Sequence, residues 1–169
     1  MVRLADLPAW EREHLLGKVK DLVGFDGRPW VKPPLAQCRI AIVTTAGLHR
    51  KGDRPFGPSA TATDHRIIPG DTPAAELVMS HQSVNFDRTG FQEDHNVEFP
   101  IDRLSELARE KIIGSVADYR YAFMGAATIR KLEPKARELA GLLKQDRVDA
   151  VLLTPSRPYS ADLVFSARE

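Results

Sequence analysis

The sequence lacks the features that identify several classes of protein. Its 169 residues include a single cysteine, Cys38, which excludes an intrachain disulfide and a cysteine-rich zinc site. It contains no apolar run near the roughly 20 residues that a membrane-spanning helix needs, and no charged-then-apolar leader. We therefore expect no membrane partner, and a cytoplasmic protein, since a reducing compartment suits a chain without disulfides.

Neither sign of charge dominates the chain. Lysine and arginine together number 24 and aspartate and glutamate 23, which leaves a formal net charge of +1. The two signs are interspersed, so we expect no nucleic-acid partner. Neither G-x-G-x-x-G nor G-x-x-x-x-G-K-[ST] occurs. We therefore find no nucleotide or flavin motif and expect no such cofactor.

What the chain does contain is the composition of one ordinary globular domain. Hydrophobic residues make up 43% and charged residues 28% of it, and its length suits a single sizeable core. Residues 4–22 are predicted to form an amphipathic helix with Pro8 in its first turn, followed by a glycine- and proline-rich connector. We divide the chain into an N-terminal helix and connector, residues 1–37, and an α/β domain, residues 38–169.

Strands and helices alternate along the predicted domain. We predict strands at residues 39–43, 65–68, 77–80, 112–117 and 150–153, a helix at 101–110, and a helix at 126–146 that Pro134 divides into two pieces. Helices between strands imply right-handed crossovers and a mainly parallel sheet. The predicted fold class is therefore α/β: a single three-layer domain with a mainly parallel sheet flanked by helices, flavodoxin- or Rossmann-like.

Residues 118–125 allow two interpretations. Tyr119 and Tyr121 could line a pocket with Arg120 between them, because each phenol has an apolar body and a polar tip. Alternatively, Tyr119, Tyr121 and Phe123 pack one face of an extension of the preceding strand.

The ends of three predicted strands point to a binding site. In an open α/β sheet, ligands bind just beyond the carboxyl ends of the strands. The stretch V-D-A-V-L-L-T-P-S-R-P-Y-S (148–160) turns at Thr154, where the prolines stop regular structure. Small residues follow the first strand, and Gly47 there can adopt a positive φ. We expect these side chains to converge on a substrate pocket: Thr44, Thr45, Gly47, His49, His81 and Thr154.

Two polar stretches add candidates whose roles stay open. The first is either plain surface charge or a cationic lip that binds a substrate carboxylate, and consists of His49, Arg50, Lys51, Asp53 and Arg54. The second could bond loops, contact substrate or bind a metal, and contains His81, Asp87, Asp94, His95 and Asn96. No close histidine pair supports a metal, so we predict none. Asp87 and Asp94 join the predicted substrate contacts.

The stretch D-H-N-V-E-F-P-I-D-R-L (94–104) also has a structural interpretation. Asp94, Asn96 and Arg103 are predicted to fix the long loop against the helix that begins after Pro100. There, Asn96 or Asp94 would bond exposed amide groups at the helix start.

Six stretches in order resemble the selenoprotein B family of glycine, sarcosine, betaine and D-proline reductases, particularly its short members. They are A-I-V-T-T-A-G-L-H-R-K-G-D-R-P-F (41–56), I-I-P-G-D (67–71), V-M-S-H-Q-S-V-N-F-D (78–87), F-Q-E-D-H-N-V-E-F-P-I-D-R-L (91–104), I-I-G-S-V-A-D-Y-R-Y-A-F-M-G (112–125) and D-A-V-L-L-T-P (149–155). The ordered set covers most of the chain after residue 38 and is far more specific than any one stretch.

The resemblance implies a site whose reaction centre is altered. The family has a selenocysteine or cysteine directly after the last strand and a cysteine three residues later. Those positions are Arg157 and Ser160 here, and neither is a redox nucleophile. Cys38 precedes the first strand, so we expect it near that strand's amino end, roughly 20 Å from the active loop. The family also continues through a longer helix and another strand, so this chain is expected to be C-terminally shortened, with an exposed sheet edge.

Two functions follow from the resemblance. The first is a reductase that, in its complete form, cleaves a carbon–heteroatom bond in a small amino-acid-like substrate, with selenocysteine as its redox group and with a partner reductase subunit. The second is a non-redox binding or regulatory subunit that keeps the pocket and lacks the pair. Association into a homo-oligomer is a further expectation, because it would cover the exposed edge.

Overall fold

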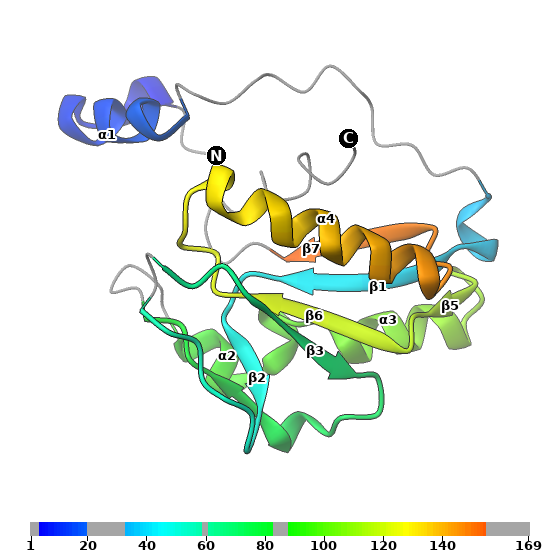
Figure 1. Cartoon of the computed structure of the whole chain (residues 1–169). Coiled ribbons are helices and arrows are strands. Elements are labelled where there is room, and N and C mark those ends of the chain that lie inside the picture. Colours follow the sequence, from blue (N-terminus) through cyan, green and yellow to red (C-terminus); the bar gives the residue numbers. More distant parts are fainter. Residues whose placement is uncertain (1–3, 20–32, 59–60, 83–87, 155–169) are drawn as a thin grey trace.

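The computed structural model describes residues 4–19, 33–58, 61–82 and 88–154 (Figure 1). A five-stranded sheet is at its centre, and strand β1 (Arg39–Thr44) has neighbours on both sides. Strand β7 (Ala150–Thr154) pairs with β1 in parallel over its whole length, from Ile40 opposite Ala150 to Thr44 opposite Thr154. The prediction of a mixed α/β fold with a mainly parallel sheet is confirmed.

The other side of β1 is covered by an interrupted strand. Strands β5 (Ser115–Val116) and β6 (Tyr119–Phe123) both pair with β1 in parallel. Ala117 and Asp118 separate them, so the pairing with β1 shifts as a bulge does. The outermost strand, β3 (His65–Pro69), runs antiparallel to β6, in agreement with the predicted short edge strand.

Strand β6 decides between the two interpretations of its tyrosines. Tyr121 is 2% exposed and packs with Phe123 in one core cluster, whereas Tyr119 is 46% exposed. The two tyrosines therefore do not line a pocket together, and the extended-strand interpretation is confirmed for Tyr121 and Phe123. The predicted strand at 112–117 was wrong in its bounds, since only Ser115–Val116 are extended before the bulge.

A second, two-stranded sheet was missed by the sequence analysis. Strand β2 (Leu48–Arg50) pairs antiparallel with β4 (Leu77–Met79), with His49 opposite Val78. Residues 48–50 were not among the predicted strands, yet they form one. Their partner is distant in the chain, and three residues are too few to show a period of two.

Helices cover both faces of the main sheet. Helix α3 (Ile101–Arg109) contributes Ile101 and Leu104 to a cluster with Ile40 and Ile42 of β1. Helix α4 (Ile129–Gln145) packs on the opposite face against Val43 and the rings of β6 (Figure 1). Because β1 is buried on both faces, its sequence is a continuous apolar run instead of an alternating one. The finer assignment to a flavodoxin- or Rossmann-like fold stays a prediction.

Helix α4 corrects the expectation of two pieces. It runs without a break from Ile129 to Gln145 with Pro134 inside it. Proline removes one hydrogen bond to the carbonyl four residues earlier. The buried side chains of Leu132, Ala136 and Leu139 flank Pro134 on one face, and this packing keeps the helix continuous.

The α-helix of the N-terminal region begins later in the chain than predicted. A 3₁₀ helix, η1 (Leu4–Asp6), precedes helix α1 (Ala9–Val19). Pro8 stands just before α1, where its carbonyl accepts bonds from the Glu11 and Arg12 amides at 3.1 and 3.0 Å. Trp10 is 72% exposed. None of the described helices is long and apolar enough to cross a membrane.

Short helical turns occupy much of the remaining connections. They are the 3₁₀ helices η2 (Leu35–Gln37), η3 (Ala74–Glu76) and η4 (His95–Val97), and the short helix α2 (Thr89–Glu93). Two of them, α2 and η4, lie in the stretch between residues 81 and 98 that was expected to be a long irregular loop.

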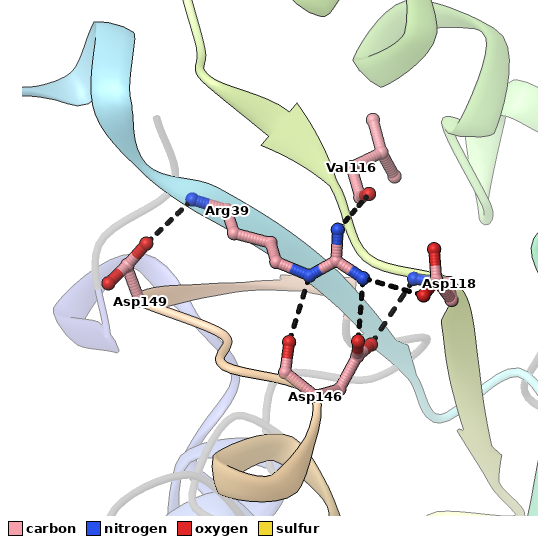
Figure 2. Close-up of polar contacts among 5 residues, drawn as sticks. All are labelled: Arg39, Val116, Asp118, Asp146 and Asp149. Atoms are coloured by element: carbon pink, nitrogen blue, oxygen red, sulfur yellow. Dashed lines mark hydrogen bonds and ion pairs between the residues drawn. The ribbon is translucent and has the colours of Figure 1, made fainter.

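A polar network fixes the amino end of the main sheet (Figure 2). Arg39 Nη2 lies 2.6 Å from Asp146 Oδ1 and 3.0 Å from Asp118 Oδ2, while its Nη1 donates to the Val116 carbonyl at 3.2 Å. The backbone amide of Arg39 donates to Asp149 Oδ2 at 2.8 Å. One side chain thus connects the start of β1 to the end of α4 and to the bulge between β5 and β6.

Candidate functional site

The carboxyl ends of three parallel strands meet at one end of the sheet. Thr44 pairs with Thr154, and the Thr45 amide donates to the Thr154 carbonyl at 3.2 Å. The Gly47 amide donates to the carbonyl of Phe123, the last residue of β6, at 2.9 Å. The predicted convergence of Thr44 and Thr154 is therefore confirmed. Their role as substrate contacts stays a prediction.

Hydroxyl groups at this end differ in how they are bonded. Thr44 is fully buried, and its Oγ1 lies 3.1 Å from the Thr154 carbonyl and 3.3 Å from the Glu98 carbonyl, while it accepts from the Ala46 amide at 3.2 Å. It therefore ties strand ends together. Thr154 Oγ1 is buried and has no hydrogen-bond partner among the described residues, and such a group is expected to bond a water or a ligand.

Two glycines let the backbone segments approach at this end. Gly47 has φ +65°, and a Cβ there would lie 3.0 Å from the His81 amide nitrogen. Gly125 has φ +69°, and a Cβ there would lie 2.5 Å from Thr45 Cβ. The expected positive φ of Gly47 is confirmed. His81, buried against the Gly47 turn, is thereby brought beside the strand ends.

His49 forms a close polar contact that the sequence analysis did not identify. Its Nε2 lies 2.6 Å from Ser80 Oγ, and its Nδ1 lies 2.9 Å from the Arg50 carbonyl oxygen. The Ser80 amide donates to the Gly47 carbonyl at 2.9 Å. His49 and Ser80 are therefore adjacent to the Gly47 turn. They are 31 positions apart in sequence, so no local motif could have revealed the pair.

Glu98 is a second residue that the sequence analysis missed. Its backbone carbonyl lies beside Thr44, and the residue is half-buried. Burial raises the pKa of its carboxyl group, which makes Glu98 a candidate functional group at this end. Glu98 differs from the other acidic residues nearby because it is half-buried. That burial depends on tertiary packing, so the sequence did not reveal it.

Asn96 bonds the start of α3 as predicted, and Asp94 bonds Asn96. Asn96 Oδ1 accepts from the Asp102 amide at 3.1 Å, and Asp94 Oδ1 accepts from the amide and the side-chain nitrogen of Asn96, both at 2.9 Å. These hydrogen bonds lower the pKa of Asp94. Arg103 was also predicted to fix the loop, but its ion pair is with Glu106 of its own helix, at 3.0 Å.

His95 lies close to the same helix start. Its Nε2 is 3.1 Å from Asp102 Oδ2, a separation that suits an ion pair, but the directions of the two groups do not make a hydrogen bond. Such a pair is charged only when the imidazole is protonated. We therefore give the contact no role in the candidate site.

The predicted cationic lip is partly neutralised. Arg50 donates to Asp53 through its backbone amide at 3.2 Å and through Nε and Nη2 at 3.4 Å. Burial acts to raise the pKa of Asp53, but hydrogen bonds from Arg50 outweigh it and lower that pKa. Lys51 and Arg54 are exposed.

Three predicted site residues, Asp87, Arg157 and Ser160, lie outside the described residues. In the part of the chain that the structure describes, no group of three or more His, Cys, Asp or Glu side chains could hold a metal ion. The metal interpretation of His81, Asp87, Asp94, His95 and Asn96 therefore gains no support from these residues.

Cys38 lies at the other end of β1, as expected. It directly precedes Arg39, is fully buried, and its Sγ lies 3.4 Å from the carbonyl oxygens of Pro33 and Pro34. Burial raises the pKa of its thiol, and the nearby charge of Asp149 adds to the effect. The six residues of β1 separate Cys38 from Thr45, a span of roughly 20 Å.

An open groove of about 590 Å³ lies at the amino end of β6, away from the converging strand ends. It is lined by Pro69, Gly70, Asp71, Val116, Ala117, Asp118, Tyr119 and Arg120. Arg120 is buried, and burial lowers the pKa of its guanidinium, which the charges of Asp102 and Asp71 partly offset. Because the groove lies at the opposite end of β6 from the strand ends at Thr44 and Thr154, we do not assign it to the candidate site.

Comparison with known proteins places these features in a family. Residues 21–156 match the model of the family described as glycine/sarcosine/betaine reductase selenoprotein B. The chain is 36% identical over 126 residues to D-proline reductase subunit gamma of Acetoanaerobium sticklandii, an alignment that covers 73% of this chain and 51% of that protein. It is 36% identical over 137 residues to glycine reductase complex component B subunit gamma of Symbiobacterium thermophilum, covering 77% and 32%.

A third relative is betaine reductase complex component B subunit beta of Peptoclostridium acidaminophilum, at 28% identity over 151 residues, covering 88% of this chain and 32% of that protein. The chain thus spans about half the length of the first of these relatives and about a third of the other two. No solved structure matches the chain.

Proposed function

Because the chain belongs to the glycine/sarcosine/betaine reductase selenoprotein B family, we propose that it binds a small amino-acid-like ligand at the carboxyl ends of β1, β6 and β7. We further propose that this chain alone does not carry out thiol-dependent reductive cleavage. The proposed lack of reductive cleavage rests on the position of Cys38, which lies at the opposite end of β1 from Thr44.

The requirements for a reactive thiol support the proposal that this chain alone has no reductive activity. A thiolate attacks only where it is ionised and within contact distance of its target. The Cys38 thiol is buried with a raised pKa, and it is a whole strand length from the candidate site. Arginine and serine stand at positions 157 and 160, where the family pattern has its selenium or sulfur groups.

Side chains of two residues whose carbonyls bond Thr44 support ligand binding. Thr154 Oγ1 is buried and forms no hydrogen bond within the described part of the chain, and Glu98 is a half-buried carboxyl group whose pKa burial raises. A bound ammonium group would stabilise the ionised Glu98, because an opposite charge favours the charged form. A ligand that carries an amine and further polar atoms therefore matches this end of the sheet.

A second candidate function is reductive cleavage with a partner. Two of the relatives are named as component B subunits of reductase complexes. In this alternative the present chain binds the substrate and a second polypeptide provides the thiol pair. The two functions share the ligand site and differ in whether a partner completes the reaction.

Calorimetric titration tests the binding site. We expect the chain to bind at least one of glycine, sarcosine, betaine and D-proline, and Glu98→Gln to weaken the binding of an ammonium ligand about tenfold, as for a lost hydrogen bond to a charged group. Glu106→Gln is the matched control, since Glu106 pairs with Arg103 on α3. Failure to bind any of the four, or equal loss in both variants, would contradict the proposed site.

A turnover assay tests the redox part. With dithiothreitol as the reductant, the unmodified chain should release no reduced product from these substrates. In the R157C/S160C variant we expect the thiol at position 157 to be alkylated faster than a free thiol if the strand end still stabilises a thiolate. Turnover by the unmodified chain alone would overturn the proposal, whereas turnover only after addition of a partner subunit would support the second function.

A further inference from the structure

The contact between Ser80 and His49 has the geometry of a nucleophile and its base. We propose that Ser80 Oγ is a nucleophile toward activated acyl groups and that His49 Nε2 accepts its proton. The arrangement needs no thiol, so it is independent of the redox chemistry associated with the family and of the proposed amino-acid-like ligand.

The hydrogen bonds of His49 determine which atom carries each proton. A carbonyl oxygen can only accept, so His49 Nδ1, at 2.9 Å from the Arg50 carbonyl, must be the protonated nitrogen. Nε2 then carries a lone pair and accepts the proton of the Ser80 hydroxyl, at 2.6 Å. A nucleophile bonded to a base, with the base oriented by a third group, is the arrangement typical of nucleophilic catalysis.

The accessibility of the two side chains differs as this role requires. His49 is 4% exposed, whereas Ser80 at the end of β4 is partly exposed. The base is thus shielded from water while the hydroxyl can be reached. Pairing of β2 with β4 and the bond from the Ser80 amide to the Gly47 carbonyl, at 2.9 Å, hold both residues in place.

A carboxylate near His49 could stabilise the charge that forms on the ring. Asp53 is bonded to Arg50, the residue that orients His49. A positive charge on His49 would act on Asp53 in the same direction as Arg50, to lower its pKa, although Arg50 has the larger effect. Asp53 is therefore within electrostatic range of the imidazolium that would form when Ser80 loses its proton.

The chemical step balances within the site. A bond forms between Ser80 Oγ and the acyl carbon, and the bond from that carbon to the leaving group breaks. The proton passes from Ser80 Oγ to His49 Nε2 and then to the leaving group. Water afterwards hydrolyses the Ser80 ester: the water oxygen bonds to the acyl carbon, the bond from that carbon to Ser80 Oγ breaks, and the proton that His49 Nε2 takes from the water passes to Ser80 Oγ. No oxidant or reductant takes part, because the acyl carbon keeps its oxidation state.

Labelling with a fluorophosphonate probe, followed by peptide mass spectrometry, tests the pair. We expect the probe to modify Ser80 in the unmodified chain, Ser80→Ala to abolish the label, and His49→Gln to slow labelling by about a hundredfold or more, as for loss of a general base. Ser105→Ala is the control, because the Ser105 hydroxyl donates to the Ile101 carbonyl within α3 at 2.8 Å. It should leave labelling unchanged.

A second variant keeps the test decisive if His49→Gln does not fold, which circular dichroism will show. In Ser80→Cys, with His49 intact, we expect the introduced thiol to be alkylated by iodoacetamide at neutral pH at least ten times faster than a free thiol, on the order expected for a histidine-paired cysteine. Absence of the label from Ser80 would overturn the proposal, as would equal labelling in a folded His49→Gln variant or alkylation of the introduced thiol no faster than a free one. Ligand binding in the calorimetric titration would be unaffected by those outcomes.

Discussion

At the scale of single residues, Asn96 joins the loop before α3 to the start of that helix. Its Oδ1 accepts from the Asp102 amide, which otherwise has no partner within the helix. Asn96→Ala should therefore lower the free energy of unfolding by about 1 kcal/mol, the typical effect of a lost helix cap. Urea denaturation followed by circular dichroism measures this change.

Arg103→Ala tests whether Arg103, like Asn96, fixes the loop before α3. The Arg103 pair with Glu106 is an exposed pair within one helix, so its loss should lower stability by no more than about 0.5 kcal/mol. A larger effect for Arg103→Ala than for Asn96→Ala would show that the arginine, and not the amide, fixes the loop.

Gly125 is a second residue with a specific structural requirement. Its φ is +69°, and its missing Cβ would lie 2.5 Å from Thr45 Cβ. We expect Gly125→Ala to combine the cost of a left-handed conformation, about 1–2 kcal/mol, with a further ~1–3 kcal/mol from overpacking. Thermal or urea unfolding measures the loss.

Gly52→Ala is the matched control for Gly125→Ala. Gly52 also has a positive φ, +85°, but nothing lies within 4 Å of its missing Cβ. Only the conformational cost should appear there. Equal losses at the two positions would mean that the Gly125 turn moves away from Thr45 without penalty.

At the scale of elements, the packing of β3 against β6 makes stability depend on pH. The ring of His65 on β3 contacts those of Phe123 and Tyr121, at centroid distances of 5.5 and 6.2 Å. Burial lowers the pKa of His65, and the charges of Glu138, Lys135, Asp64 and Arg66 modify it to a smaller extent. Within the residues that the structure describes, His65 Nδ1 has no hydrogen-bond partner, so a protonated ring gains no bond there.

The sign of this effect follows from proton binding. Between the unfolded pKa of histidine, about 6.5, and the lower folded pKa, the unfolded chain binds more protons, so stability falls as the pH falls. The loss is at most about 1.4 kcal/mol for each pH unit from one group. We expect His65→Phe to reduce the fall in stability between pH 7 and pH 5.5, measured by urea unfolding. An unchanged slope would exclude His65 as its source.

Helix α4 illustrates how packing overrides a local signal at this scale. Proline inside a helix removes a hydrogen bond, and the sequence accordingly predicts a break at Pro134. The side chains of Leu132, Ala136 and Leu139 nevertheless form one continuous stripe against the sheet. Burial of that stripe outweighs the missing hydrogen bond, since each fully buried leucine contributes about 1.5–3 kcal/mol.

At the scale of the whole molecule, reaction of Cys38 reports the opening of the domain. The thiol is fully buried and its pKa is raised by burial. We expect the native chain to react with Ellman's reagent at least about a thousandfold more slowly than the urea-unfolded chain, because reaction requires an opening of the structure. Fast reaction in the native state would contradict the burial of Cys38.

The same measurement bears on the proposed lack of reductive activity. If ligand binding leaves the Cys38 rate low, the thiol stays at its own end of β1 throughout binding. A ligand that exposed Cys38 to fast reaction would instead show a rearrangement able to bring the thiol into use.

The sequence by itself determined the α/β class and the mainly parallel sheet. It also determined that Thr44 and Thr154 lie at one end of that sheet and Cys38 at the other. These conclusions rest on the order of strands and helices along the chain, which fixes the direction in which parallel strands run. The same local pattern identified Asn96 as a cap, because the residues that cap a helix are close to it in sequence.

Tertiary structure alone decided the continuity of α4, the strand at Leu48–Arg50, and the pairing of His49 with Ser80. It also decided that Glu98, among many acidic residues, is half-buried and has a raised pKa. Each of these depends on contacts between segments far apart in the chain. A period of two or of 3.6 residues does not encode such contacts, because it reports which face of an element is buried and not which residue it meets.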